Sequence, residues 1–463
     1  MTVSNSKSTP DTANALRAPA PSRVTARRVL LGSLSGSAIE WFDFFLYATA
    51  AALIFDKQFF PTNDPALSLM LSYVTVSLTF FIRPFGGVLF AHIGDRVGRK
   101  KTLVITLSLM GGATVVIGLL PTYGQVGVLA PILLLACRVI QGLAIGGEWG
   151  GALLLAFENA PARRRGFYGS VPQSGATIGM LLATAAFAVV SQLPMGAFEA
   201  WGWRLPFIAS IVLVFVGLWI RNGLGETPAF QDAKKAGDVA KLPIAEVLRD
   251  HWRSVLVAIG GKAFEVAPFY IFATFVVSYA TGTLDFSRST VLNAITAGAF
   301  VSTFAILLSG ALSDRFGRRR TFLFGVIATG AFMVPFFLLL DIGMDWAVYV
   351  AVIIGLGVVW PPVTATFGTF LSELFPTRVR YTGISLSSQV GSALAGGTAP
   401  LIATWMLSAF GGSWTPIAAY LVGLALISIV SALIAPSVTR RETRRLTHRV
   451  AGDRSTDATG TRA

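Results

Sequence analysis

Long apolar stretches alternate with short polar segments along almost the whole chain. We place twelve such stretches at 29–55, 67–93, 102–121, 127–158, 168–190, 203–221, 253–281, 289–312, 321–340, 346–372, 381–408 and 414–435. A helix rises about 1.5 Å per residue, so each stretch is long enough to cross about 30 Å of hydrocarbon. The pattern predicts an all-α membrane protein with twelve transmembrane helices.

The composition indicates the same class of protein. Of the 463 residues, 54% are hydrophobic and only 13% are charged, whereas about a quarter of an ordinary soluble domain is charged. So few polar side chains cannot cover the surface of a soluble core. The same figures exclude a disordered chain, a coiled coil and a collagen. The single Cys137 excludes a disulfide-rich secreted scaffold.

The net charge of +14 is distributed unevenly between the two sides of the predicted membrane. All but six of the 37 Lys and Arg residues lie in the two tails or on connections that follow even-numbered spans. Because positively charged segments stay in the cytoplasm, we expect both tails there, where they also attract anionic lipid. No patch of interleaved aromatic and basic residues accompanies this charge, so a nucleic-acid partner is not expected.

An internal repeat divides the chain into two halves. Three patterns recur: D-R-x-G-R after spans 2 and 8, E-x-x-P-x-R-x-R after spans 4 and 10, and Q-x-G in spans 5 and 11. Their copies are 219, 215 and 216 residues apart. Each half has six spans, an even number, so both halves have the same orientation in the membrane. This is the arrangement of transporters with two parallel repeats.

The repeat also sets the expected domain boundaries. They are a cytoplasmic N-terminal tail (1–28), an N-terminal six-helix bundle (29–221), a cytoplasmic linker (222–252), a C-terminal six-helix bundle (253–435) and a basic cytoplasmic C-terminal tail (436–463). The linker is the longest polar connection inside the chain. Its segment 244–249 has the pattern of a short amphipathic helix on the membrane surface.

Several ionisable side chains lie inside the spans, where each costs several kcal/mol unless it is paired or hydrated. Counting along the helices from cytoplasmic basic residues places four of them at a similar depth, about 18–22 Å from those residues. They are Glu40, Arg83, Glu148 and Glu265. Arg138 is expected nearer the outer side. These residues are therefore the first candidates for function.

The spacing of these residues also groups them by helical face. Glu40, Asp43 and Tyr47 share one face of span 1, and span 4 has a similar polar sector. Such faces line a central aqueous cavity or contact one another. A carboxylate in a poorly hydrated cavity exchanges protons near neutral pH, and an arginine holds a substrate carboxylate through two hydrogen bonds.

From this chemistry we assign candidate roles. The expected proton-coupling residues are Glu40, Asp43, Arg138 and Glu148. The expected substrate-binding residues are Tyr47, Arg83, Arg138, Gln141, Gln173, Glu265 and Gln389. The alternative is structural: ion pairs that hold the bundle together, and glutamines that only bridge helices.

Two levels of family resemblance are visible in these motifs. The D-R-x-G-R loops, together with R-x-x-Q-G at 138–142, resemble the signatures of the major facilitator superfamily. The segments E-W-F-D-F at 40–44, R-P-x-G-G at 83–87, G-G-E-W-G-G at 146–151 and W-R-x-P-F at 203–207 are similar to the metabolite:proton symporter family within it. The resemblance covers about 28–436. Ala91 stands where the superfamily motif begins with glycine, whereas Gly310 fits it.

This resemblance implies a transporter that works by alternating access, in a family whose members carry shikimate, 2-oxoglutarate, citrate, proline or betaine. It also implies that the repeated loops hold the cytoplasmic side closed. The expected gating residues are Asp95, Arg96, Gly98, Arg99, Glu158, Arg165, Asp314, Arg315, Gly317, Arg318, Glu373 and Arg380. We expect Glu158 to pair with Arg165, and Glu373 with Arg380. The alternative is that the basic residues only anchor the loops in the cytoplasm.

The sequence therefore predicts a proton-coupled symporter that imports a small organic acid across the cell membrane, in bacteria the inner membrane. A monomer is expected, with the proton as coupling ion and no cofactor. An antiporter and a non-transporting sensor of the same fold are the alternatives. The phosphate-binding pattern G-x-x-x-x-G-K-[ST] is absent, so ATP is not expected to drive transport. No metal site or enzyme activity is expected, because the three histidines are far apart and no nucleophile–base pair lies in the spans.

Overall fold

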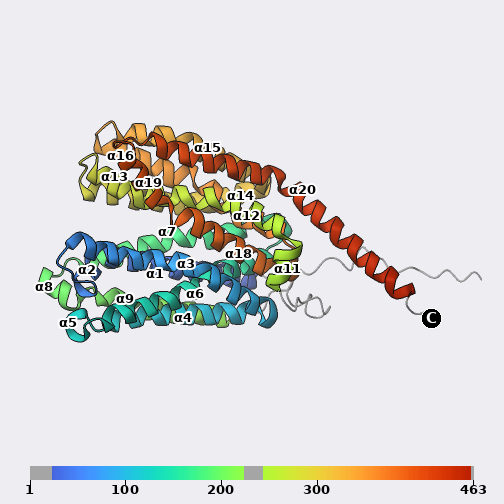
Figure 1. The fold of residues 1–463 in the computed structure, drawn as a ribbon, viewed down its shortest axis with the longest axis horizontal. Coiled ribbons are helices and arrows are strands. Elements are labelled where there is room, and N and C mark those ends of the chain that lie inside the picture. The colour runs from blue at the N-terminus through green and yellow to red at the C-terminus, as the bar shows by residue number, and fades with distance from the viewer. Residues whose placement is uncertain (1–22, 224–242, 460–463) are drawn as a thin grey trace, which may run out of the picture.

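The computed structural model describes residues 23–223 and 243–459, and every element in these two ranges is helical. Twelve of the helical segments in them are long and apolar enough to cross a membrane. They lie side by side in two groups, the earlier part of the chain below and the later part above in Figure 1. The predicted fold class, with twelve spans, is confirmed.

The N-terminal group contains six long helices joined by short ones. The long helices are α1 (Arg23–Leu53), α3 (Pro65–Val97), α4 (Arg99–Leu119), α6 (Leu129–Glu158), α7 (Arg165–Val190) and α9 (Arg204–Asn222). The short segments are α2 (Phe55–Gln58), α5 (Tyr123–Val126), η1 (Ala162–Arg164), α8 (Met195–Ala197) and η2 (Phe198–Gly202).

The C-terminal group follows α11 (Pro243–Asp250) and is less regular. Its first three spans are α12 (Trp252–Tyr270) with η3 (Ile271–Phe275) and α13 (Val276–Gly282), then α14 (Arg288–Phe316), then α15 (Arg318–Leu340). The fourth combines α16 (Asp345–Val352), η4 (Ile353–Val359) and α17 (Pro361–Leu374). The fifth combines η5 (Thr377–Val379), α18 (Arg380–Gly391), η6 (Ser392–Gly396) and α19 (Ala399–Ala409), and the last is α20 (Thr415–Thr459).

The two groups meet along two corresponding helix pairs. α7 packs against α14 and α17, and α3 packs against α18. The α7–α14 contact depends on two glycines. A Cβ atom at Gly310 would lie 2.1 Å from Ser170 Oγ, and one at Gly166 would lie 2.1 Å from Ser313 Oγ. Small residues therefore let these two backbones approach closely, as they do in other membrane bundles.

Three spans of the C-terminal group change to a π-helical turn part-way across. These turns are η3, η4 and η6. The described spans of the N-terminal group are continuous α-helices, and η2 lies in the connection between α7 and α9. The sequence pattern did not predict these interruptions. Because π-helical turns are frequent at functional sites, their positions bear on the cavity described below.

The last helix extends beyond the predicted boundary at 435. α20 continues through Pro436, which has no N–H to donate to the carbonyl of Ala432. The side chain of Arg319 replaces that donor, with Nε 2.8 Å from the Ala432 oxygen. The chain therefore stays helical into the segment expected to be a tail, and Figure 1 shows this extension projecting from the bundle.

The other predicted connections are described only in part. α1 begins at Arg23, inside the expected N-terminal tail, and 1–22 lie outside the described residues. Residues 224–242 of the linker also lie outside them. The predicted amphipathic helix is present as α11, and it packs against α12, α18 and η5 with Val247 buried. α11 therefore covers the end of the protein bundle instead of lying only on lipid.

Candidate functional site

A cavity lies between the two groups at mid-span positions. Its volume is about 40 Å³, which is room for only a few water molecules. Five of the predicted site residues line it: Glu40, Arg83, Gln173, Glu265 and Gln389. Lys262, whose role the sequence left open, also lines it. The cavity is therefore enclosed by both halves, and both contribute charged groups.

Arg83 on α3 forms no direct ion pair in the described part of the chain, although its charge acts on Glu40 across the cavity. Its side chain is buried, its Nε has no hydrogen-bond partner, and no ion pair to it is found among the residues that the structure describes. The guanidinium carbon lies 4.6 Å from the centre of the Phe80 ring and 5.5 Å from that of Phe44. Aromatic faces stabilise the positive charge, and the Nε donor stays without a partner among the described residues.

Close packing of α3 against α6 fixes the position of Arg83. A Cβ atom at Gly86 would lie 2.0 Å from the carbonyl oxygen of Leu143, and one at Gly146 would lie 2.2 Å from that of Arg83 itself. The glycine pairs let the backbones touch, which holds the arginine at the cavity.

Glu40 on α1 faces Arg83 within the same cavity lining. The carboxyl group is buried, and its Oε2 has no hydrogen-bond partner in the described part of the chain. α1 is held against α7 by another close contact, because a Cβ atom at Gly179 would lie 2.5 Å from the carbonyl oxygen of Ala38. An ionised carboxylate without a partner is costly to bury, so this geometry suits a carboxyl that carries a proton.

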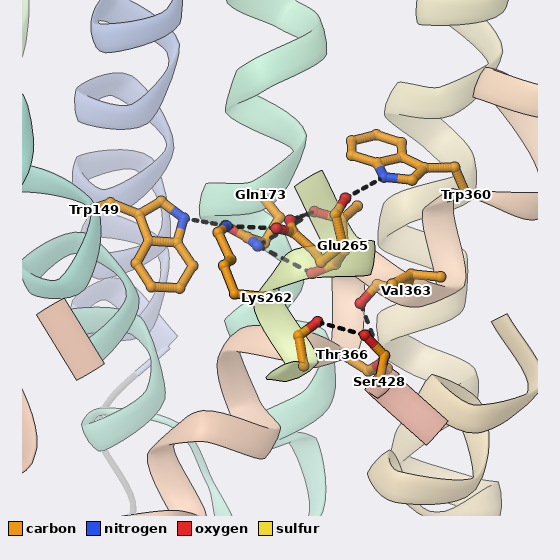
Figure 2. Close-up of polar contacts among 10 residues, drawn as sticks. Trp149, Gln173, Lys262, Glu265, Trp360, Val363, Thr366 and Ser428 are labelled. Carbon is orange, nitrogen blue, oxygen red and sulfur yellow. Dashed lines mark hydrogen bonds and ion pairs between the residues drawn. The ribbon is translucent and has the colours of Figure 1, made fainter. Parts of the chain in front are cut away.

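A chain of polar contacts crosses the other side of the cavity (Figure 2). Lys262 and Glu265, one turn apart on α12, form an ion pair, and the Glu265 Oε1 accepts a hydrogen bond from Thr364 Oγ1 at 2.8 Å. The Lys262 ammonium lies 4.8 Å from the centre of the Trp149 ring. Trp360 Nε1 donates to the backbone oxygen of Glu265 at 2.8 Å. Both charges of this pair are therefore satisfied within the protein.

The two repeat-related glutamines occupy equivalent positions across the interface. Gln173 Nε2 donates to the carbonyl oxygen of Thr364 in the C-terminal group at 3.0 Å, while its Oε1 accepts from Trp149. Gln389 Nε2 donates to the carbonyl oxygen of Gly146 in the N-terminal group at 3.2 Å. Each glutamine thus joins its own half to the other at the level of the cavity.

Aromatic side chains cover much of the remaining wall. The Trp41 and Phe269 rings meet edge to face with centres 5.6 Å apart, and the Phe269 and Trp360 rings are 5.0 Å apart. Tyr270 lies beside them and immediately precedes η3, and Trp360 immediately follows η4. The π-helical turns therefore adjoin cavity residues.

Five of the candidate residues do not line this cavity, and four of them lie together. Asp43, Tyr47, Arg138 and Gln141 form a separate buried cluster inside the N-terminal group. Gln141 accepts from Arg138 Nη1 at 2.8 Å and donates to Thr114 Oγ1 at 2.7 Å, and Thr114 in turn donates to Asp43 Oδ2 at 2.8 Å. Of the two arrangements open from sequence, mutual contact is the one found for this face.

Two further contacts of the cluster involve Tyr47. The Arg138 guanidinium carbon lies 3.7 Å from the centre of the Tyr47 ring, and the Tyr47 hydroxyl is 2.5 Å from Thr75 Oγ1. Asp43 Oδ1 and Arg138 Nη2 have no hydrogen-bond partner among the described residues. The cluster therefore retains hydrogen-bonding capacity although it is closed off from the cavity.

Glu148 is absent from the cavity lining, and the structural alternative of an ion pair is the arrangement found. Its carboxylate forms a buried ion pair with Arg221 from the end of α9, and Thr106 Oγ1 donates to Oε2 at 2.9 Å. Arg221 Nη1 also donates to the Leu103 carbonyl oxygen at 2.7 Å. A Cβ atom at Gly36 would lie 1.5 Å from Arg221 Nη2, so α1 covers this pair and separates it from the cavity. Sequence reasoning missed Arg221 because it is the last residue of a predicted span.

We call the end of the bundle that carries Gly98 and Gly317 the motif end. The two groups are joined there by Asp314, whose oxygens accept from the backbone N–H groups of Gly166 at 2.7 Å and Phe167 at 2.9 Å. A carboxylate at the first turn of α7 suits the positive end of the helix dipole. Gly98 and Gly317 have φ values of 122° and 95°, a region that favours glycine.

The predicted pairing of the other motif-end residues is wrong. Glu158 pairs with Arg380 of the other half at 3.3 Å, and Glu373 pairs with Arg318. Arg165 instead lies over the Phe157 ring, 5.0 Å from its centre. The loops of the two halves adjoin one another, so Glu158 reaches the corresponding arginine of the opposite repeat.

Four further gating candidates lie in or beside the D-R-x-G-R loops. Arg315 lies over the neighbouring Phe316 ring at 5.8 Å, and Arg96 is exposed. The side chains of Asp95 and Arg99 lie outside the described residues. The contact of the motif aspartate with a helix N-terminus is therefore described for Asp314, in the second copy of the motif, and not for Asp95 in the first.

Comparison with known proteins decides the family. Residues 33–400 match the model of the Major Facilitator Superfamily. The chain belongs to this superfamily. This major facilitator is 38% identical over 413 residues to the shikimate transporter of Escherichia coli (strain K12), covering 88% of this chain and 94% of that protein. It is 34% identical over 427 residues to the proline/betaine transporter of the same strain, covering 90% and 84%.

A solved structure supports the fold independently. The proton:xylose symporter XylE bound to 6-bromo-6-deoxy-D-glucose superposes with a TM-score of 0.70 at 17% identity, covering 89% of this chain and 95% of that one. The predicted resemblance to metabolite transporters of this superfamily is confirmed, and the relatives are transporters and not enzymes. The major facilitator described here is accordingly a multi-pass membrane transport protein.

Proposed function

We propose that this major facilitator is a proton-coupled symporter that imports a small organic anion. The observation that carries the proposal is that one cavity between the halves holds both a cation and a carboxyl group that make no direct ion pair. Arg83 is a buried cation with no carboxylate partner in the described ranges, and Glu40 is a buried carboxyl with an unpartnered oxygen. A substrate carboxylate would bind Arg83, and a proton would neutralise Glu40.

The proposed mechanism is alternating access. At the motif end, Asp314 and the Glu158–Arg380 pair join the two halves. Opening that side requires these contacts to break, and the glutamine bridges at cavity level would break with them. We place the motif end in the cytoplasm because the basic residues concentrate there. In a bacterium the protein would lie in the inner membrane.

The Asp43–Arg138 cluster is the second candidate for proton coupling. It holds a carboxylate oxygen and a guanidinium nitrogen without partners, and it lies on α1 only one turn from Glu40. In this proposal it acts behind the cavity, without contact to substrate. Glu148 is assigned no proton-carrying role, since its carboxylate is already bound by Arg221 and Thr106.

Transport into proteoliposomes tests the proposal. Purified protein is reconstituted and given an imposed inward proton gradient, with labelled shikimate, lactate, succinate and glycine betaine as probes. Accumulation of a carboxylate above equilibrium that disappears with a protonophore supports symport. Expulsion of the probe under the same gradient would indicate an antiporter. Specific binding without any movement would indicate a sensor.

A further inference from the structure

The cavity contains four charged groups, of which two form an ion pair with each other and two do not. Lys262 and Glu265 neutralise each other, and the second oxygen of Glu265 is bound by Thr364. Arg83 and Glu40 have no such partners in the described part of the chain. The cavity thus offers one available cation and one available carboxyl, while a second cation is present but occupied.

We propose that Glu265 makes this transporter selective for monocarboxylates by occupying Lys262. The inference rests on the proposed function. One substrate carboxylate binds Arg83 while one proton neutralises Glu40, so the cavity has no net charge before and after loading. A second carboxylate on the substrate would have to displace Glu265 from Lys262.

Displacement is unfavourable because it leaves a buried carboxylate without its counter-ion. Glu265 lies in the cavity wall with its side chain buried, and its backbone oxygen is also fixed by Trp360. The Lys262 ammonium lies against the neighbouring Trp149 and Phe367 rings, at 4.8 and 5.2 Å from their centres. No second direct ion pair to either partner is found among the described residues, although the Lys262 charge also acts on Glu40. Glu265 therefore takes the place on Lys262 that the second carboxylate of a diacid would need.

The wall beside Arg83 fits the same substrate class. Trp41, Phe269 and Trp360 form a continuous aromatic surface in the cavity wall, which joins the polar chain at Trp360. A monocarboxylate places its single charge on Arg83 and its uncharged body against these rings. The second charged end of a diacid would meet either the rings or the occupied lysine.

The selectivity is tested by uptake of matched probes by the full-length protein. Shikimate and lactate serve as monocarboxylates, and succinate and 2-oxoglutarate as dicarboxylates, at equal inward proton gradient. We expect the parent protein to favour the monocarboxylates at least about tenfold in initial rate. Equal rates for both classes would overturn this inference but leave the proposed function standing. Movement of none of the four would overturn both.

Substitutions of Lys262 and Glu265 test whether their ion pair causes the selectivity. Glu265→Gln releases Lys262, and the ratio of succinate to shikimate uptake should rise at least about tenfold. The double variant Lys262→Met, Glu265→Gln removes the released cation and should lose that gain. Asp345→Asn, an exposed carboxylate on α16, is the matched control and should keep the parent ratio. A folded Glu265→Gln protein with the parent ratio would refute the proposal. The parent measurement remains decisive if the variant does not fold.

Discussion

The two six-helix groups are related by a sequence repeat but bury very different chemistry. The described spans of the N-terminal group bury six acidic or basic side chains: Glu40, Asp43, Arg83, Arg138, Glu148 and Arg221. In the described spans of the C-terminal group, Lys262 and Glu265 are the only buried acidic or basic side chains, and they neutralise each other on one helix.

The same groups differ in the regularity of their helices. The C-terminal spans change to π-helical turns at η3, η4 and η6, while the described N-terminal spans remain α-helical. π-Helical turns weaken the regular hydrogen-bond ladder of a helix. In the proposed mechanism, the N-terminal group would supply most of the charged groups, and the interrupted C-terminal spans would supply the segments that bend around the substrate.

Removing the proton site should have the largest effect. Glu40→Gln keeps the shape of the side chain but cannot exchange a proton, so we expect loss of gradient-driven accumulation with exchange of substrate across the membrane retained. Accumulation and counterflow in proteoliposomes measure the two. The control is Glu199→Gln, which changes a carboxylate in η2, at the end of the bundle away from the motif end.

The comparison with Asp43 makes this prediction sharper. Asp43→Asn removes a carboxylate from the closed cluster, one turn away on the same helix. If Asp43→Asn abolishes accumulation and Glu40→Gln does not, the proton site lies in the cluster and not at the cavity.

The second largest effect concerns the ion pair behind α1. Arg221→Met leaves Glu148 buried without its counter-ion, which costs about 3–5 kcal/mol. The expected result is a large fall in the unfolding temperature in detergent. Adding Glu148→Leu removes the orphaned charge and should restore most of the stability.

The corresponding change in the C-terminal group should be milder. Lys262→Met also orphans a carboxylate, and like Glu148 the orphaned Glu265 keeps one threonine hydrogen bond. Glu265 differs in that it lines a cavity with room for water. A loss of stability as large as that of Arg221→Met would contradict the proposed difference between the groups.

Several features of this molecule could be predicted from its sequence. The twelve spans, the repeat and the positions of Glu40 and Arg83 follow from hydropathy, spacing and depth. The two glutamines are equivalent because the repeat makes them so. These features depend on periodicity along the chain, which a single sequence contains.

The remaining features depend on contacts between distant segments. Arg221 lies 73 residues from Glu148 and looked like the charged end of a span. The motif-end pairing was ambiguous because both repeats carry the same glutamate and arginine pattern, so each glutamate had a candidate in either half. The cavity edge passes between Glu40 and Asp43 on one helical face, and spacing alone cannot locate that edge.

The two copies of the loop motif offer a smaller test. Gly310→Ala places a methyl group 2.1 Å from Ser170 Oγ and 2.9 Å from the carbonyl oxygen of Gly166. Overpacking of this kind costs about 1–3 kcal/mol, so the motif end should open about tenfold more often. Spin labels at cysteines replacing Arg163 and Phe316, in a Cys137→Ser background, would report a larger long-distance population.

The first copy of the motif supplies the matched control. Ala91 stands at the position equivalent to Gly310, and its methyl group is already accommodated in the apolar cluster beside Tyr381. Ala91→Gly should therefore leave the label distances unchanged. If both substitutions, or neither, shift the distances, the close approach at Gly310 does not control the motif end.

The smallest expected effect lies where the last helix contacts the first span of the C-terminal group. Glu442 on the α20 extension accepts from Ser254 N at 3.2 Å and from Ser254 Oγ at 2.7 Å, and it contacts His251 Nδ1 at 3.1 Å. The carboxylate thus caps the N-terminus of α12, and its loss in Glu442→Gln should cost about 1 kcal/mol. The unfolding temperature would fall by a few degrees at most. Because α12 carries the Lys262–Glu265 pair and is followed by η3, this cap anchors the end of a span that is irregular further on. A variant with unchanged stability but faster transport would show that the cap restrains bending and contributes little to folding.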